Sequence, residues 1–177
     1  SYLVTAYTWG VSTPPRAART RAYGSYGPTQ KLADAFAMAN GRYPITGYTN
    51  GDQAQPIIDP ESGYSETGFS TFTHPIYGDE LKNTFMMYQN REPRFYINVF
   101  WSGMTWHSGN VKKTDMQFYN GGNSGYGATQ QNYTATGYLV HKFFDYTRDT
   151  ATNGDKYDIA TWGYLDWPII RYAEILL

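Results

Sequence analysis

The chain contains no cysteine in its 177 residues, which excludes disulfide bonds, thiolate metal sites and cysteine nucleophiles from this segment. Charge is also scarce. Only 16% of the residues are charged, and 14 Lys and Arg against 15 Asp and Glu give a net charge of -1. Basic residues cluster only between positions 16 and 21. Nucleic-acid binding needs a basic surface that neutralises phosphates, so we expect no nucleic-acid partner.

Long hydrophobic runs are missing as well. No stretch reaches the about 20 apolar residues that cross a bilayer, and no signal peptide is recognisable. The chain starts at Ser1 without Met and stops at Leu177 inside an apolar run. We therefore expect both ends to be cut from a longer chain, which leaves room for an export signal or a lipid anchor outside these residues. A length of 177 residues suits one domain.

Aromatic residues are what the chain has in excess. Its 18 Tyr, 9 Phe and 5 Trp make up 18% of the sequence, and 18 Gly and 9 Pro accompany them. A plain helical bundle would build its core from Leu and Ala and would contain few glycines. This composition predicts short elements held among long, aromatic-rich loops.

The hydrophobic spacing predicts three helices and two strands. The helices are expected at about 29–39, 79–88 and 166–177, and the strands at 95–101 and 137–144. Thr29 is the expected N-cap of the first helix. The two strands are expected to pair. Residues 45–75 and 102–135 are predicted to be long irregular loops, because Gly and Pro interrupt the first and the second is rich in Gly, Asn, Ser and Tyr.

Motifs of metalloproteases, serine hydrolases, nucleotide-binding loops and redox dithiols are absent from the sequence. His74, His107 and His141 lie far apart without carboxylates at ligand spacing, which favours hydrogen-bonded roles over metal binding. The carboxylates of one loop are the remaining candidates for a glycosidase pair: Asp52, Asp59, Glu61 and Glu66. A solvated acidic loop is the favoured interpretation of that group. We expect no catalytic residue, no metal and no cofactor.

Aromatic and amide side chains gather around the second long loop. A pyranose ring has an apolar C–H face that stacks on an aromatic ring, while its hydroxyls need polar partners. The predicted ligand-binding residues are Trp106, His107, Asn110, Tyr119, Asn120 and Tyr126. The alternative is that these rings fill a core beneath the loops. Strand alternation favours burial for Trp101, whereas for Trp106 exposure and burial remain equally open.

Four ordered segments carry a family resemblance. They are Pro28–Phe36 with the following Asn40-Gly41, Tyr88–Tyr96 (YQNREPRFY), Thr136–Phe143 (TGYLVHKF) and Pro168–Leu177. Together they resemble the SusD/RagB family of outer-membrane nutrient-binding lipoproteins. Two positions depart from the family pattern: Glu92 stands where Asp is usual, and His141 where a basic residue is common. Neither departure disturbs the order or the spacing of the segments.

The resemblance implies a mainly α protein, of which residues 1–177 are a partial, loop-rich domain with about three helices and a small antiparallel strand pair. The helical-repeat part would lie in the rest of a longer chain. The resemblance also implies a surface-exposed location at the outer membrane, a lipid anchor on an earlier segment and a partner transporter of the SusC type. The shared motifs are interpreted as structural, with Arg91 and Arg94 tying a turn by charge-assisted hydrogen bonds.

We therefore predict non-catalytic binding of a nutrient glycan, followed by hand-over to a SusC-type TonB-dependent transporter. The alternative from another class is a scaffold or peptide-binding lid of the same kind of transporter. A glycoside hydrolase is the third choice. Oligosaccharide and peptide binding would distinguish the first two, and release of reducing sugar would revive the third.

Overall fold

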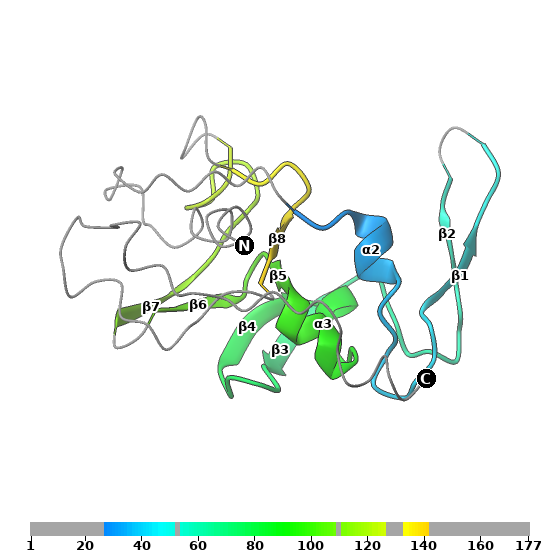
Figure 1. The fold of residues 1–177 in the computed structure, drawn as a ribbon, viewed down its shortest axis with the longest axis horizontal. Coiled ribbons are helices and arrows are strands. Elements are labelled where there is room, and N and C mark those ends of the chain that lie inside the picture. The colour runs from blue at the N-terminus through cyan, green and yellow to red at the C-terminus, as the bar shows by residue number, and fades with distance from the viewer. Residues whose placement is uncertain (1–26, 52–53, 109–110, 127–132, 142–177) are drawn as a thin grey trace, which may run out of the picture.

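The computed structural model describes residues 27–51, 54–108, 111–126 and 133–141. The elements in chain order are α2 (Gln30–Asp34), β1 (Ile45–Tyr48), β2 (Pro56–Ile58), β3 (Phe69–Thr73), β4 (Glu80–Phe85), the 3-10 turn η1 (Met86–Tyr88), α3 (Pro93–Asn98), β5 (Val99–Trp101), β6 (Thr105–Ser108), β7 (Val111–Asp115) and β8 (Tyr138–Val140). The strands form four antiparallel pairs, β1–β2, β3–β4, β5–β8 and β6–β7 (Figure 1). The β1–β2 hairpin extends away from the other elements.

The expectation of a mainly α fold with about three helices and one strand pair is wrong. The described residues hold two helices of five and six residues, one 3-10 turn and four strand pairs. The segment expected as a helix over 79–88 is mostly strand β4. Leu81 and Thr84 are both buried there, because a bulge at the two residues between them restores the inward direction. The helix was expected because Leu81, Phe85 and Tyr88 recur at helical spacing. In the structure Phe85 ends β4, Tyr88 belongs to η1, and both are half-buried.

The helix expected over 29–39 stops at Asp34. Its start is as predicted, because the Thr29 hydroxyl caps the backbone N–H of Leu32. Its end is earlier because tertiary partners replace the helical hydrogen bonds: the Ala37 N–H donates to the Glu92 side chain at 3.1 Å, and Met38 forms a β-bridge with Arg91. The helix was expected to bury an apolar stripe of Leu32, Ala35, Phe36 and Ala39. That expectation is wrong too, since Leu32 is 52% exposed and Ala35 and Ala39 are also exposed.

The pairing expected between two distant strands is confirmed, but their extents differ. The segment expected as a strand over 95–101 begins as helix α3, which has Pro93 in its first turn, and only β5 is extended. Strand β5 pairs with β8, with Val99 opposite Val140 and Trp101 opposite Tyr138. All three β5 residues are buried, so the strand has no exposed face.

The two segments expected to be irregular contain hairpins. Pairs β1–β2 and β3–β4 fall in or overlap the first, and β6–β7 falls in the second. The helix expected over 166–177 lies outside the described residues, as does the expected strand beyond His141. None of the described helices is long and apolar enough to cross a membrane.

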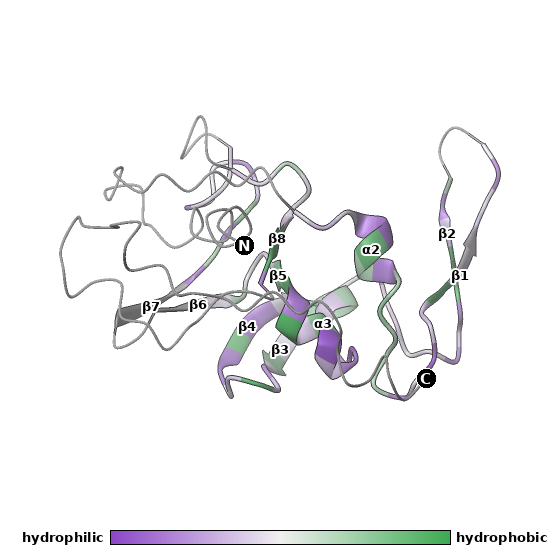
Figure 2. Ribbon diagram, viewed as in Figure 1, coloured by the Kyte–Doolittle hydropathy of each residue, from purple (hydrophilic) through white to green (hydrophobic). Residues whose placement is uncertain are grey.

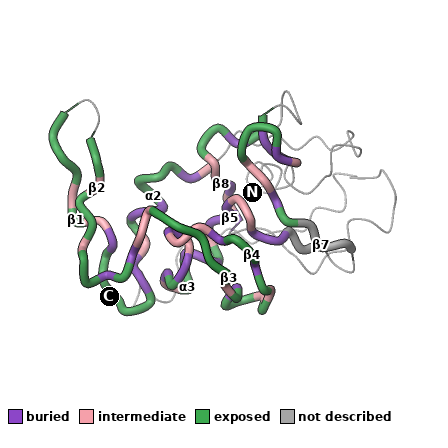
Figure 3. Tube along the Cα trace, turned by 180° about the vertical axis from the view of Figure 1, so that it is seen from behind, coloured by how far each residue is buried: buried purple, intermediate pink, exposed green. Residues whose placement is uncertain are grey.

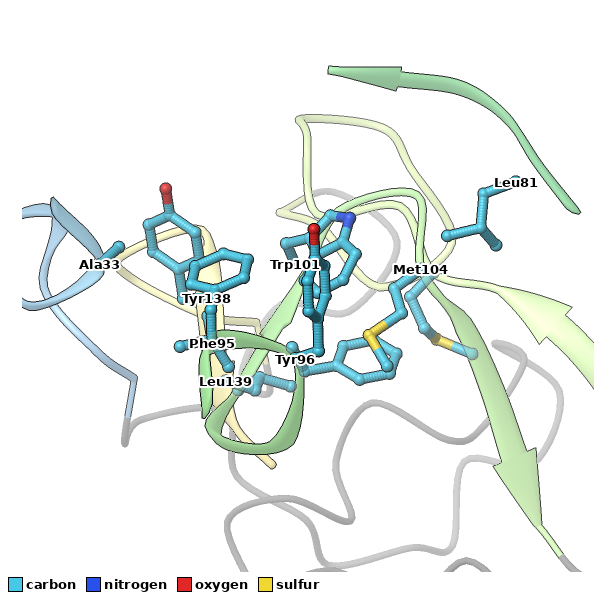
Figure 4. Close-up of a cluster of buried hydrophobic side chains, with 11 residues drawn as sticks. Ala33, Leu81, Phe95, Tyr96, Trp101, Met104, Tyr138 and Leu139 are labelled. Carbon is cyan, nitrogen blue, oxygen red and sulfur yellow. The ribbon is translucent and has the colours of Figure 1, made fainter. Parts of the chain in front are cut away.

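The core forms around the β5–β8 pair, where the hydrophobic colouring concentrates (Figure 2). Eleven buried side chains make the main cluster, and Trp101, fully buried, lies in its middle (Figure 4). Its ring stacks on Phe95 at 5.5 Å and on His74 at 5.6 Å. Seen from behind, β5 and β8 are buried while the β1–β2 hairpin is largely exposed (Figure 3). The prediction that Trp101 belongs to the core is confirmed.

Candidate functional site

The segment Tyr88–Tyr96 contains a buried arginine that joins this segment to helix α2. Arg91 is 3% exposed, and its guanidinium donates to the carbonyls of Ala33, Phe36 (2.9 Å) and Met87 (3.2 Å). The first two carbonyls lie at the C-terminal end of α2, where a cation is favoured. Burial lowers the pKa of Arg91 from its ordinary value. The predicted structural role of this arginine is confirmed.

Arg94, three residues later, makes a different kind of contact. Its guanidinium pairs with the Glu92 carboxylate at 2.8 Å, and its side chain is 71% exposed. The same carboxylate accepts the backbone N–H of Ala37. Glu92, which stands where Asp is usual in the family pattern, therefore joins the turn to the segment after α2.

A second network ties helix α2 to β8. The Tyr138 hydroxyl donates to Gln30 Oε1 at 2.8 Å, and Gln30 Nε2 donates to the buried Asp34 carboxylate at 2.7 Å. Tyr48 of the β1–β2 hairpin donates to the other oxygen of Asp34 at 2.9 Å. Burial raises the pKa of Tyr138, so its hydroxyl remains a donor at physiological pH. Three of the four family segments are thus joined by Arg91 and this network.

A cleft of about 620 Å³ opens between the β3–β4 hairpin and the end of β7. Its lining combines aromatic rings with polar and charged groups: Phe69, Lys82, Asn83, Phe85, Tyr88, Ser102, Gly103, Asp115, Gln117 and Tyr119. This volume is within the range of small-molecule sites. We call it the Phe69 cleft, and it is our candidate site.

Two exposed aromatic rings stand at the Phe69 cleft. Phe69 is 67% exposed and Tyr119 is 59% exposed. The Phe69 ring packs against Phe85 at 5.0 Å with an interplanar angle of 37°, so one ring backs the other. An exposed phenylalanine that lines a cleft is more informative than a scattered surface one, because it offers an apolar face where a ligand would be enclosed.

The turn at Ser102 and Gly103, which forms the floor of the cleft, is hydrogen-bonded to the segment after β7. The backbone turns after β5 at Ser102 and Gly103, and the N–H of Gly103 donates to the carbonyl of Met116 at 2.6 Å. The Ser102 hydroxyl accepts the N–H of Phe118 at 3.1 Å. Gly103 has a φ of 97°, a conformation that favours glycine. The buried Trp101 precedes this turn directly, so the core positions the floor.

The loop that carries Tyr119 is held by its own hydrogen bonds. Asn123 accepts the N–H of Gln117 at 2.9 Å and donates to the carbonyl of Asp115 at 2.8 Å. Gly125 packs so closely that an added Cβ would lie 1.8 Å from the Tyr119 carbonyl oxygen. These contacts hold the backbone of the loop that carries Tyr119, which limits the backbone ordering entropy that binding would cost.

The structure brings some of the predicted binding residues together. Tyr119 lines the Phe69 cleft, and Asn120 and Tyr126 are exposed on the same loop. The ring of Tyr126 contacts Tyr133 at 5.3 Å. Trp106 and His107 have their backbone on β6, where Trp106 pairs with Thr114. Asn110 lies outside the described residues.

Most residues that line the cleft were not predicted from the sequence. Phe69, Lys82, Asn83 and Phe85 come from segments expected to be a loop and a helix, and Gln117 was not selected from the second loop. The available signal was the exposed environment of Phe69, which follows Thr67-Gly68 and precedes Ser70. That pattern alone does not distinguish a surface ring from a core ring.

The loop carboxylates considered for a glycosidase lie elsewhere. Asp59 and Glu61 both pair with Arg42, at 2.7 and 2.8 Å. The hydrogen bond from Arg42 lowers the pKa of Asp59. Glu66 accepts from the Tyr64 hydroxyl, and Asp52 lies outside the described residues. None of the three described carboxylates, Asp59, Glu61 and Glu66, lines the Phe69 cleft.

Two of the three histidines are core residues. His74 is 1% exposed and accepts the backbone N–H groups of Ile76 and Tyr77 at Nδ1, while His141 Nε2 lies 3.2 Å from the Tyr77 hydroxyl. Within the described segments, no group of three or more His, Asp or Glu side chains could hold a metal ion.

Comparison with known proteins gives one decisive match. The sequence model of the SusD family matches residues 5–177. The chain belongs to the SusD family. A similar solved structure is a SusD-like protein from Bacteroides fragilis NCTC 9343, with 25% identity and a TM-score of 0.45. The match covers 77% of this SusD-family chain but 21% of that protein, so the chain spans about a fifth of its length. No curated protein matches.

Proposed function

We propose that this SusD-family chain contributes to the non-catalytic capture of a nutrient glycan, with the Phe69 cleft as one of its subsites. The observation that carries the proposal is an open cleft with exposed Phe69 and Tyr119 rings beside amide side chains. A sugar is complementary to this lining, since its apolar C–H face can stack on the aromatic rings and its hydroxyls can bond to the amides. The family membership supports nutrient binding as the role.

In this proposal the sugar ring stacks on Phe69, which Phe85 supports from behind. Asn83 and Gln117 then exchange hydrogen bonds with the hydroxyls. An aromatic contact of this kind contributes about 1 kcal/mol beyond its buried area. Affinity at one such subsite is modest, which suits capture followed by hand-over.

The larger setting belongs to the same proposal. We expect the chain to be a partial domain of a longer, lipid-anchored protein at the outer membrane, which hands its glycan to a SusC-type transporter. Other contacts would come from the sequence-predicted residues Trp106, His107, Asn110, Asn120 and Tyr126. Unchanged glycan binding by Trp106→Ala would remove that residue from the site.

Calorimetry with a panel of oligosaccharides tests the cleft. We expect Phe69→Ala and Tyr119→Ala each to weaken binding of the cognate glycan by about five- to tenfold, as the loss of one stacking contact predicts. The control is Tyr43→Ala, since Tyr43 is as exposed as Tyr119 (59%) but does not line the cleft. Equal affinities for wild type and both cleft variants would refute the assignment.

A second candidate function is favoured by one observation. The β1–β2 hairpin exposes Tyr48, Ile57 and Ile58, and it extends away from the other elements (Figures 1 and 3). Exposed apolar groups of this kind suit protein contact, so the chain would act as a scaffold or peptide-binding lid. Binding of peptides in the absence of any oligosaccharide binding would reverse the ranking. Release of reducing sugar would instead identify a glycoside hydrolase.

A further inference from the structure

Strand β4 contains a bulge at the wall of the Phe69 cleft. Ser70 of β3 pairs with Thr84 and Phe72 pairs with Leu81, so two residues of β4 oppose a single residue of β3. The two extra-register residues are Lys82 and Asn83. Asn83 has a φ of 57°, in the left-handed region that non-glycine residues rarely adopt. Bulges are enriched beside functional sites, where they redirect side chains.

The bulge changes what the cleft can recognise. In a regular strand two consecutive side chains point to opposite faces, yet Lys82 and Asn83 both line the cleft. Together they bring an ammonium with three N–H donors and an amide with two. The described residues contain no carboxylate paired with Lys82. The bulge therefore presents two neighbouring donors, one of them charged, to a ligand.

Asp115 is the other charged residue of the lining, and it is already engaged. Its Oδ1 accepts the Thr105 hydroxyl at 2.6 Å, across the β6–β7 pair. No ion pair within 4.0 Å joins it to Lys82 among the described residues. This hydrogen bond leaves the Asp115 charge in place, so the described lining carries one cation and one anion, and its two neighbouring donors are Lys82 and Asn83.

We propose that the Phe69 cleft takes an acidic sugar, whose carboxylate or sulfate oxygens bind Lys82 and Asn83 while its ring stacks on Phe69. This inference rests on the proposed glycan binding and names the class of ligand. The anionic group accepts from both donors of the bulge, and charge-assisted hydrogen bonds are stronger than neutral ones. The backbone strain at Asn83 is retained because it aims the amide beside the ammonium.

Calorimetry on the purified protein tests the ligand class with four probes: a galacturonic acid oligosaccharide, a chondroitin sulfate oligosaccharide, a neutral cello-oligosaccharide and a glucosamine oligosaccharide. We expect at least one acidic probe to bind about tenfold more tightly than the neutral one. Its affinity should fall as NaCl rises from about 0.05 M to about 0.5 M. The two acidic probes distinguish a carboxylate from a sulfate.

Variants assign the effect to the bulge. Lys82→Gln should lower the affinity for the acidic probe by about tenfold and so remove the preference for it over the neutral probe. Asn83→Gly keeps the left-handed backbone while deleting the amide, and it should weaken acidic binding by several-fold. Lys31→Gln, at an exposed lysine of α2, is the matched control and should have no effect. Equal binding of neutral and acidic probes, or a preference for the glucosamine probe, overturns the inference. A Phe69→Ala variant that binds every probe normally refutes the cleft itself.

Discussion

Replacing Arg91 by methionine tests whether the family motif acts as a buried tie between segments. The guanidinium donates to the carbonyls of Ala33, Phe36 and Met87, and it lies over the Phe95 ring with its carbon 4.9 Å from the ring centroid. Methionine replaces most of the side-chain volume but removes the donor to the Phe36 and Met87 carbonyls, whereas the Ala33 carbonyl still accepts the backbone N–H of Phe36 at 3.3 Å. Each buried unsatisfied group costs about 1 to 3 kcal/mol, and we expect a total loss of about 4 kcal/mol.

Urea unfolding followed by circular dichroism measures this loss. The midpoint should fall while the slope stays constant, because the surface exposed on unfolding is unchanged. Arg91→Lys should cost about 2 kcal/mol, since an ammonium keeps the charge but reaches fewer of the three carbonyls. This milder variant keeps the experiment measurable if Arg91→Met does not fold.

The matched control is Arg94→Met in the same motif. Its ion pair with Glu92 is solvent-exposed, and such pairs contribute about 0.5 kcal/mol or less. A loss below about 1 kcal/mol for Arg91→Met, or equal losses at the two arginines, would refute the interpretation of Arg91 as the structural tie.

Two further predictions concern the core and the loop. Burial raises the pKa of Tyr96 from 10.0 to about 12. The neutral hydroxyl therefore contributes to stability below pH 10.0, and this contribution is lost as the pH rises towards 12. In Tyr96→Phe, the free energy of unfolding should fall less steeply between these two pH values. Gly125→Ala should displace the Tyr119 loop and lower glycan affinity, whereas Gly47→Ala, whose Cβ would meet only Ile57 Cδ1 at 3.7 Å, should not.

Local signals in the sequence predicted features that depend on short-range chemistry. Thr29 caps α2 as expected, and the motif arginines make the charge-assisted hydrogen bonds that were inferred. The β5–β8 pairing followed from strand composition on both sides of a long loop. The burial of Trp101 followed from strand alternation.

Features that depend on tertiary contact were not predictable in this way. The end of α2 is set by Arg91 and Glu92, more than fifty residues away in sequence, so no local stop signal marks it. The helix expected over 79–88 rested on the spacing of Leu81, Phe85 and Tyr88, and no local signal marked the bulge at Lys82 and Asn83 or the pairing of β4 with β3. Because β4 was predicted to be a helix and β3 a loop, the β3–β4 hairpin that carries Phe69 was not predicted. The cleft beside this hairpin was therefore not predicted either.

The family segments joined by Arg91 and Tyr138 share almost no residues with the Phe69 cleft. Residues of the cleft can therefore change without disturbing the contacts that hold the fold. Of the described residues that line the cleft, only Tyr88 belongs to a family segment. The others come from the β3–β4 hairpin, the turn after β5, the end of β7 and the loop that follows it. Tyr88 packs against Trp101 at 5.5 Å and Tyr138 at 6.0 Å, so it joins the two parts. Substitutions at Phe69 or Lys82 should therefore change ligand binding without loss of stability, whereas substitutions at Tyr88 should change both.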